Sequence, residues 1–61
     1  MDAKLFTLKE TANLLSLKES RLRTAVFKKE IGYLKIGHLI RFTMSDIQSF
    51  ISKSKVEVIN E

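Results

Sequence analysis

The sequence predicts a small α+β fold that is mainly helical, with three short helices and a two-stranded β-hairpin between the second and the third. Two segments begin with a threonine followed three residues later by an acid, which is a helix-start pattern. A second helical stretch follows the first after a short break, and two alternating apolar runs flank Gly37. The chain of 61 residues has room for one domain with a minimal core. We expect this domain at residues 5–52, between flexible ends at 1–4 and 53–61.

The first helix is expected to begin after Thr7. The Thr7 hydroxyl can accept a hydrogen bond from the amide of Glu10, whose carboxylate can accept one from the amide of Thr7, and together these bonds make a capping box. Phe6, just before the cap, can pack on Thr11 or Ala12 one turn later. The helical period predicts one apolar face, lined by Leu8, Ala12 and Leu15, with Leu14 beside them.

The second helix is expected over residues 19–29, after a break at 16–18. Its core-facing side holds Leu22, Ala25, Val26 and Lys29, and Leu17 covers that side from the turn. The opposite side carries Ser20, Arg23, Thr24 and Phe27, flanked by Arg21 and Lys28. Small hydroxyl side chains between arginines suit a DNA groove with phosphates on either side, although a solvated basic face is the simpler alternative. The short turn after a capped helix favours DNA binding over that alternative.

The hairpin is expected at residues 33–42. With a three-residue loop of Gly37, His38 and Leu39, the apolar side chains share one face and Lys35 faces Arg41 on the other. A two-residue loop would place Lys35 among apolar residues, so the pattern favours the longer loop. Two neighbouring cations repel each other, and a bound polyanion would relieve that repulsion. The expected apolar face consists of Leu34, Ile36, Ile40 and Phe42.

Two residues have two interpretations each. Phe27 points outward by helical phase, where a large aromatic side chain is unusual; packing beneath the hairpin is the favoured explanation, and contact with a base or a protein partner is the alternative. His38 lies at the hairpin tip, where a solvent-facing loop residue is the simplest assignment. Its functional alternative is a contact with a phosphate or the minor groove.

A third helix is expected from Thr43, with Asp46 placed to complete a second capping box. Its apolar residues recur at helical spacing and supply the last wall of the core. These residues are Ile47, Phe50 and Ile51, with help from Met44. Residues 56–61 alternate like a strand, but a short terminal segment without a pairing partner favours a frayed tail.

The positive charge is concentrated in one part of the chain. The net charge is +4, and residues 18–41 hold seven basic residues against two acidic ones, a net charge of +5. The remaining residues together carry four basic and five acidic residues, a net charge of −1. The surplus therefore belongs to the second helix and the hairpin, as expected when one helix and one loop meet a phosphate backbone.

The composition predicts no enzyme, no metal site and no cofactor. There is no cysteine, and the single histidine has no cluster of carboxylates with which to bind zinc. The serines lack a histidine at a useful spacing, the acids are scattered, and so small a chain has little room for a substrate cavity. No apolar run approaches the roughly 20 residues that a transmembrane helix needs, and no signal-peptide core is present. We expect a cytoplasmic protein that associates with the nucleoid when bound to DNA.

An ordered set of short motifs covers nearly the whole chain: Phe6–Leu15, Ser16–Arg23, Ile31–Gly37, Ile40–Phe42 and Asp46–Ile47. This set resembles the excisionase-type members of the MerR-like winged helix-turn-helix superfamily. It implies a supporting first helix, a recognition helix at residues 18–29 in the major groove, and a wing at 33–42 on the adjacent backbone or minor groove. Three positions depart from the family pattern: glycine is common at Lys29, proline at Gly32, and a small or basic residue at His38.

Two functions from different classes stay open. The localised charge favours sequence-specific binding of double-stranded DNA by a prophage or mobile-element protein, either an excisionase or a small transcriptional regulator. The alternative is a protein-interaction module on the same fold that does not bind DNA. The expected protein partners are an integrase or recombinase, and further copies of the protein on DNA. The expected DNA contacts are Lys18, Ser20, Arg21, Arg23, Thr24, Lys28, Lys35, His38 and Arg41, with Arg21 and Arg23 contributing most.

Overall fold

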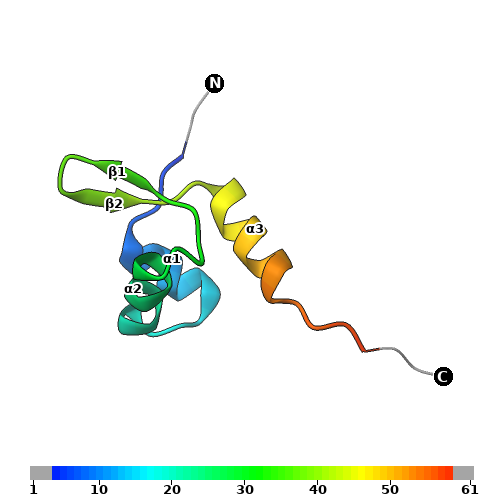
Figure 1. The fold of residues 1–61 in the computed structure, drawn as a ribbon. Helices are drawn as coiled ribbons and strands as arrows, with labels where there is room; N and C mark the ends of the chain where they lie inside the picture. Colours follow the sequence, from blue (N-terminus) through cyan, green and yellow to red (C-terminus); the bar gives the residue numbers. More distant parts are fainter. Residues whose placement is uncertain (1–3, 59–61) are drawn as a thin grey trace.

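A computed structural model describes residues 4–58 and confirms the predicted fold class. The elements follow the order α1 (Leu8–Leu15), α2 (Glu19–Phe27), β1 (Leu34–Ile36), β2 (Leu39–Arg41) and α3 (Met44–Ser54). Figure 1 shows α1 and α2 packed together, the hairpin of β1 and β2 projecting to one side, and α3 on the other side. The fold is a small winged helix-turn-helix.

Both predicted capping boxes are present. At the start of α1, the Thr7 amide donates to Glu10 Oε1 at 2.9 Å and the Glu10 amide donates to Thr7 Oγ1 at 3.0 Å. At the start of α3, the Thr43 amide donates to Asp46 Oδ2 and the Asp46 amide to Thr43 Oγ1, both at 3.1 Å. Each box satisfies amides that have no partner within the helix, which fixes where the helix begins.

The turn between α1 and α2 is set by a left-handed residue. Ser16 has φ 55, the Leu17 amide donates to Ala12 O at 2.8 Å, and the Ser16 amide donates to Asn13 O at 3.1 Å. This is the Schellman arrangement, which pairs the last carbonyls of a helix and turns the chain sharply. The turn therefore brings α2 back against α1 after only three residues.

The end of α2 uses the same arrangement, and it comes two residues earlier than expected. Lys29 has φ 58, its amide donates to Val26 O at 3.0 Å, and the Glu30 amide donates to Ala25 O at 2.8 Å. Lys29 therefore leaves the helix and is exposed, so its predicted place on the core-facing side is wrong. Glycine, which the resembled family carries at this position, adopts positive φ without the crowding that a β-carbon causes.

The hairpin corrects the predicted register. Leu34 pairs with Arg41, Lys35 with Ile40, and Ile36 with Leu39, so the loop has two residues rather than three. Gly37 has φ 62 at the first turn position, which suits a tight hairpin turn. Paired residues share a face, so Lys35 and Arg41 lie on opposite faces and the predicted repulsion between them does not arise.

The register follows from what the core needs. Phe42 is fully buried, and Tyr33 and Ile40 pack on the core. Lys35 follows Tyr33 by two residues and pairs with Ile40, so it shares the inner face of the hairpin with them. The other face holds three exposed apolar side chains: Leu34 at 41%, Ile36 at 51% and Leu39 at 53% exposure. Lys35 stays in solvent because the hairpin projects beyond the helices (Figure 1).

A contact between distant segments ties the hairpin to the start of α1. The Phe6 amide donates to Phe42 O at 2.8 Å, and the Phe42 amide donates to Phe6 O at 2.9 Å. Phe6 also packs against the core, next to α1, where Thr11 and Ala12 are buried. This bridge, together with the packing of Ile40 and Phe42 on the core, positions the hairpin relative to the helices.

The core is formed by residues from the three helices, from the segment after α2 and from the end of the hairpin. Its buried apolar members are Ala12, Leu22, Ala25, Ile31, Phe42 and Ile47. From α3, Ile47 is buried and Phe50 packs on the cluster, but Ile51 is 52% exposed, so its predicted role as a wall of the core is wrong. A β-carbon at Gly32 would lie 2.7 Å from Asp46 Oδ1, so a side chain there would disturb the cap of α3.

The helix α3 runs two residues beyond the expected domain end at residue 52. The Ser54 hydroxyl donates to Phe50 O at 2.8 Å in its last turn. Residues 55–58 follow without strand pairing, and Val56 and Val58 are exposed. Residues 1–3 and 59–61 of the two expected flexible ends lie outside the described residues.

Candidate nucleic-acid interface

The rotation of α2 decides which of its side chains face outward. Leu22 and Ala25 are fully buried against the core, and Val26 packs beside them. Because successive residues are about 100° apart around a helix, the outward stripe opposite these residues is fixed. That stripe holds Ser20, Arg23, Thr24 and Phe27, as the sequence predicts. The Thr24 hydroxyl donates to Ser20 O at 3.1 Å, which leaves its lone pairs to accept.

A groove runs between α2 and the hairpin. Its cationic side chains come from three separate elements: Lys9 from α1, Arg23 from α2 and Arg41 from β2, with His38 at the hairpin tip. The remaining residues that line it are Thr7, Leu8, Glu19, Leu39 and Ile40. Three positive side chains against one acid make this groove suitable for a phosphate backbone.

Arg23 lies at the centre of this region. It also lines the adjoining surface toward the C-terminal end of α2, together with Val26, Phe27, Lys29 and Tyr33. Its Nη2 lies 3.9 Å from Glu19 Oε1, and the two side chains are 68% and 44% exposed. An ion pair this exposed contributes little to folding stability. The Arg23 guanidinium can therefore exchange Glu19 for a phosphate or a base.

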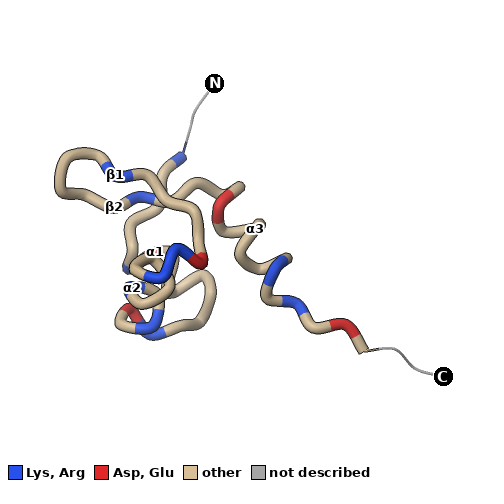
Figure 2. Tube along the Cα trace, viewed as in Figure 1, with Lys and Arg blue, Asp and Glu red and all other residues tan. Residues whose placement is uncertain are grey.

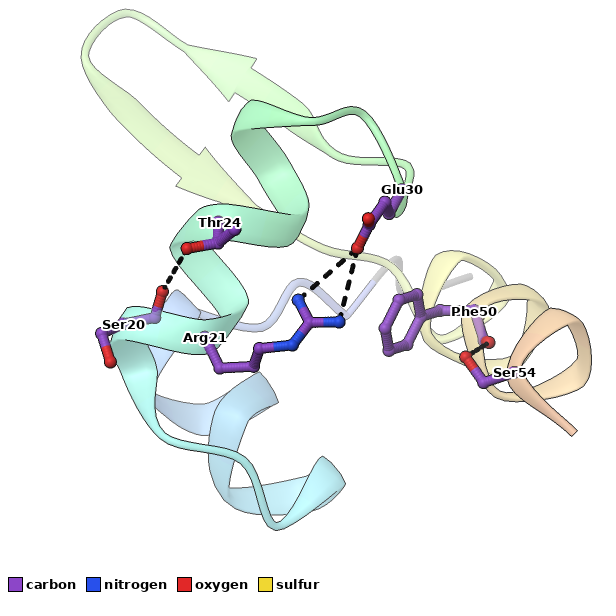
Figure 3. Close-up of polar contacts among 6 residues, drawn as sticks. All are labelled: Ser20, Arg21, Thr24, Glu30, Phe50 and Ser54. Atoms are coloured by element: carbon purple, nitrogen blue, oxygen red, sulfur yellow. Dashed lines mark hydrogen bonds and ion pairs between the residues drawn. The ribbon is translucent and has the colours of Figure 1, made fainter.

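Arg21 lies on another side of the helix. Both Nη1 and Nη2 lie 3.5 Å from Glu30 Oε1, with the two side chains 49% and 41% exposed. Figure 3 shows the Arg21 side chain extending toward Glu30 and toward Phe50 of α3, away from Ser20 and Thr24. It borders a second, largely apolar groove with Leu15, Leu17, Phe50 and Ile51. The structure therefore does not bring Arg21 together with the other predicted contacts of α2.

The remaining predicted contacts surround the outward stripe. Lys18 is the residue before α2, where its side chain makes no capping bond, and Lys28 follows the last helical residue. Both are exposed, as are Lys35 and His38. Arg41 is half-buried, and its Nη1 donates to Ile40 O at 2.8 Å. Figure 2 shows basic residues along α2, in the segment after it and on the hairpin.

Two features of the interface escaped the sequence analysis. Lys9 enters the groove from α1, and only the packing of α1 beside the hairpin gives it that place. Phe27 does not pack beneath the hairpin as expected, because it is 87% exposed. The helical phase predicts correctly that Phe27 points outward. Whether the hairpin covers Phe27 depends on tertiary packing, which local sequence patterns do not predict.

One acid near the groove has a perturbed pKa. The hydrogen bond from the Thr7 amide holds the pKa of Glu10 below its usual value, with smaller contributions from Lys4 and Arg41. Glu10 therefore stays ionised at neutral pH and keeps the cap of α1 intact.

Comparison with known proteins gives one match. The sequence model of a helix-turn-helix domain family matches residues 5–55. The chain belongs to this helix-turn-helix domain family. Membership indicates DNA binding, for which the motif is suited because its second helix fits the major groove. No curated protein and no solved structure gives a significant match.

Two kinds of site are absent from residues 4–58. None of the helices in this part of the chain combines the length and the apolar character needed to cross a bilayer. Within the same residues, no three His, Cys, Asp or Glu side chains are grouped in a way that could hold a metal ion.

Proposed function

We propose that this protein binds double-stranded DNA in a sequence-specific manner, with α2 in the major groove and the hairpin on the adjacent backbone or minor groove. The observation that carries the proposal is the groove in which Arg23 of α2 lies with His38 and Arg41 of the hairpin. A helix and a wing that share one positive groove can hold the same strand from two sides.

The proposed contacts divide into two groups. Ser20, Arg23 and Thr24 lie on the outward stripe of α2 and are assigned to base edges, where hydroxyl and guanidinium groups form specific hydrogen bonds. Basic side chains at the ends of α2 and on the hairpin are assigned to phosphates, which fix the position of the protein without reading sequence. These phosphate contacts are Lys18, Lys28, Lys35, His38 and Arg41. Arg21 is assigned a lesser part because Glu30 engages it on another flank of the helix.

We assign the protein to a mobile element or prophage, where it acts as an excisionase or as a small transcriptional regulator. The resemblance of the two helices and the wing to excisionase-type proteins supports this assignment. An excisionase works beside an integrase or recombinase, and a single small module selects weakly among genomic sites. Further copies on adjacent sites are therefore the second expected partner.

The test begins by selecting bound duplexes from a random DNA pool and footprinting the protein on the selected site. Affinity for that duplex and for a scrambled duplex is then measured between about 50 and 200 mM salt. We expect a clear preference for the selected site and a steep fall in affinity with salt, because each neutralised phosphate releases counterions. The absence of any enriched sequence, or affinity that is independent of salt, would contradict the proposal.

A second candidate function rests on a different observation. The outer face of the hairpin exposes Leu34, Ile36 and Leu39, a row of apolar side chains suited to a protein partner. A protein-interaction module would show no salt-dependent DNA binding, and substitution of these residues would abolish its partner contact. The same salt titration therefore separates the two candidates.

A further inference from the structure

Phe27 is unusual because a large aromatic side chain is left in solvent at a fixed position. It is the last residue of α2 and is 87% exposed, the highest value among the large exposed apolar residues of the described chain. A buried phenylalanine would remove about 150–250 Å² from water, so this side chain contributes almost nothing to the stability of the isolated fold. We therefore look for a role of Phe27 in binding and not in folding stability.

The place of Phe27 on α2 relates it to the proposed base contacts. It follows Ser20 by seven residues, Arg23 by four and Thr24 by three, so all four side chains form one stripe. At 1.5 Å per residue, the stripe from Ser20 to Phe27 is about 10.5 Å long, which corresponds to about three base-pair steps of roughly 3.4 Å. A helix that presents Ser20 and Arg23 to base edges therefore presents Phe27 to the same groove.

The chemistry of the groove then limits what Phe27 can contact. Most groups on the major-groove edges of bases are hydrogen-bond donors and acceptors, and the C5-methyl of thymine is the apolar exception. Arg23 and Lys29 line the surface on which Phe27 lies. Arg23 can therefore bond a neighbouring base edge while Lys29 holds a flanking phosphate. An aromatic ring on the same surface as these two cations is thus placed to cover a methyl group while Arg23 and Lys29 fix the position of the DNA.

We propose that Phe27 selects thymine within the DNA site by packing on its C5-methyl group in the major groove. This inference rests on the proposed DNA-binding function and names one specificity-determining residue of that site. It does not require Phe27 to contact a phosphate, so the salt dependence of binding should be unaffected by its substitution.

The test removes the methyl group and the ring separately. In the selected duplex, each thymine is replaced in turn by deoxyuridine, which lacks only the C5-methyl group. Wild-type protein should lose affinity at one or two positions by about fourfold each, the effect expected from one methyl-sized apolar contact. Phe27→Ala should bind the original duplex correspondingly more weakly and show no further loss on deoxyuridine at those positions.

Two control variants are available in the chain. Phe27→Leu keeps an apolar side chain and should retain part of the sensitivity to the methyl group. Leu14→Ala removes an exposed apolar side chain from α1, on a surface with Lys4, Phe6 and Asn13, and should behave like the wild type. Because Phe27 and Leu14 are both exposed, far-UV circular dichroism should show both variants folded.

The outcomes separate this inference from the function on which it rests. Wild-type protein that binds no duplex would overturn both. Wild-type protein that binds its selected site but is indifferent to every deoxyuridine would overturn the inference alone. The inference alone would also be overturned if Phe27→Ala lost as much affinity as the wild type on each deoxyuridine substitution. It would likewise be overturned if Phe27→Ala lost only the cooperative binding of several copies, because that result would assign Phe27 to a contact between proteins.

Discussion

The two flanks of α2 carry arginines with different neighbours. Arg21 pairs with Glu30 beside α3, whereas Arg23 opens into the groove shared with the hairpin. Two residues along a helix correspond to about 200° of rotation, so neighbouring cations can serve different surfaces. A count of basic residues therefore overstates how many of them can act on one ligand.

The largest expected effect is the difference between the two arginine variants. Arg23→Ala should lower affinity for the selected duplex by about 1–3 kcal/mol, roughly 5- to 150-fold, because it removes a contact to a base edge. Arg21→Ala should lower it by less than about threefold, since its side chain faces α3. Fluorescence anisotropy with both variants measures the difference in affinity. An equal loss in both would show that the two arginines contribute equally to DNA binding.

The hairpin provides the next effect. Replacing Lys35 and Arg41 together by glutamine should reduce the slope of log affinity against log salt by about 1.8, the value for two phosphate contacts. The preferred sequence should stay the same because phosphates carry no sequence information. A changed preference with an unchanged slope would show that the hairpin reads bases, and would move specificity away from the Arg23 flank.

The turn after α2 holds Glu30 near Arg21. Substitutions of Lys29, the left-handed residue of this turn, test how much backbone strain the turn contains. Lys29→Gly should be more stable than Lys29→Ala by about 1 kcal/mol, because both variants remove the charge and only glycine removes the β-carbon at positive φ. Urea denaturation at equal m-value gives the difference. A more stable alanine variant would show that the left-handed turn is not strained.

The smallest expected effect concerns Glu30 itself. Glu30→Gln should cost less than about 1 kcal/mol of folding stability, as is usual for a half-exposed ion pair. It should also raise the affinity for non-specific DNA by about threefold at low salt, because a negative charge is lost and the Arg21 guanidinium is freed. In the double variant with Arg21→Ala, much of that gain should vanish. If the double variant kept the full gain in DNA affinity, the gain would be due to the change in net charge and not to release of the Arg21 guanidinium.

Local chemistry explains why much of the fold could be predicted. Thr7 with Glu10 and Thr43 with Asp46 predicted the starts of α1 and α3, because a capping box lies within four consecutive residues. Helical period placed Ser20, Arg23 and Thr24 on the outward side of α2. The assignment of these side chains to DNA stays a prediction.

The errors share a physical cause, which is dependence on distant segments. The sequence predicts a three-residue hairpin loop because that loop keeps Lys35 off the apolar face. In the structure Tyr33 packs on the core, which puts Lys35 on the inner face in place of Leu34 and Ile36. Whether the hairpin covers Phe27 and whether Arg21 meets Glu30 also depend on how elements pack. Alternation and helical phase describe one element at a time, so they give directions but not neighbours.

The bridge between Phe6 and Phe42 has a consequence for the order in which the domain forms. It closes a loop of 35 residues, 7–41, that contains α1, α2 and the hairpin, whereas α3 lies outside it. Contacts between residues far apart in the chain are slow to form because closure entropy must be overcome first. Once the bridge has closed, the enclosed segment should exchange its amide hydrogens as one cooperative unit, while the last turns of α3 open independently and exchange sooner.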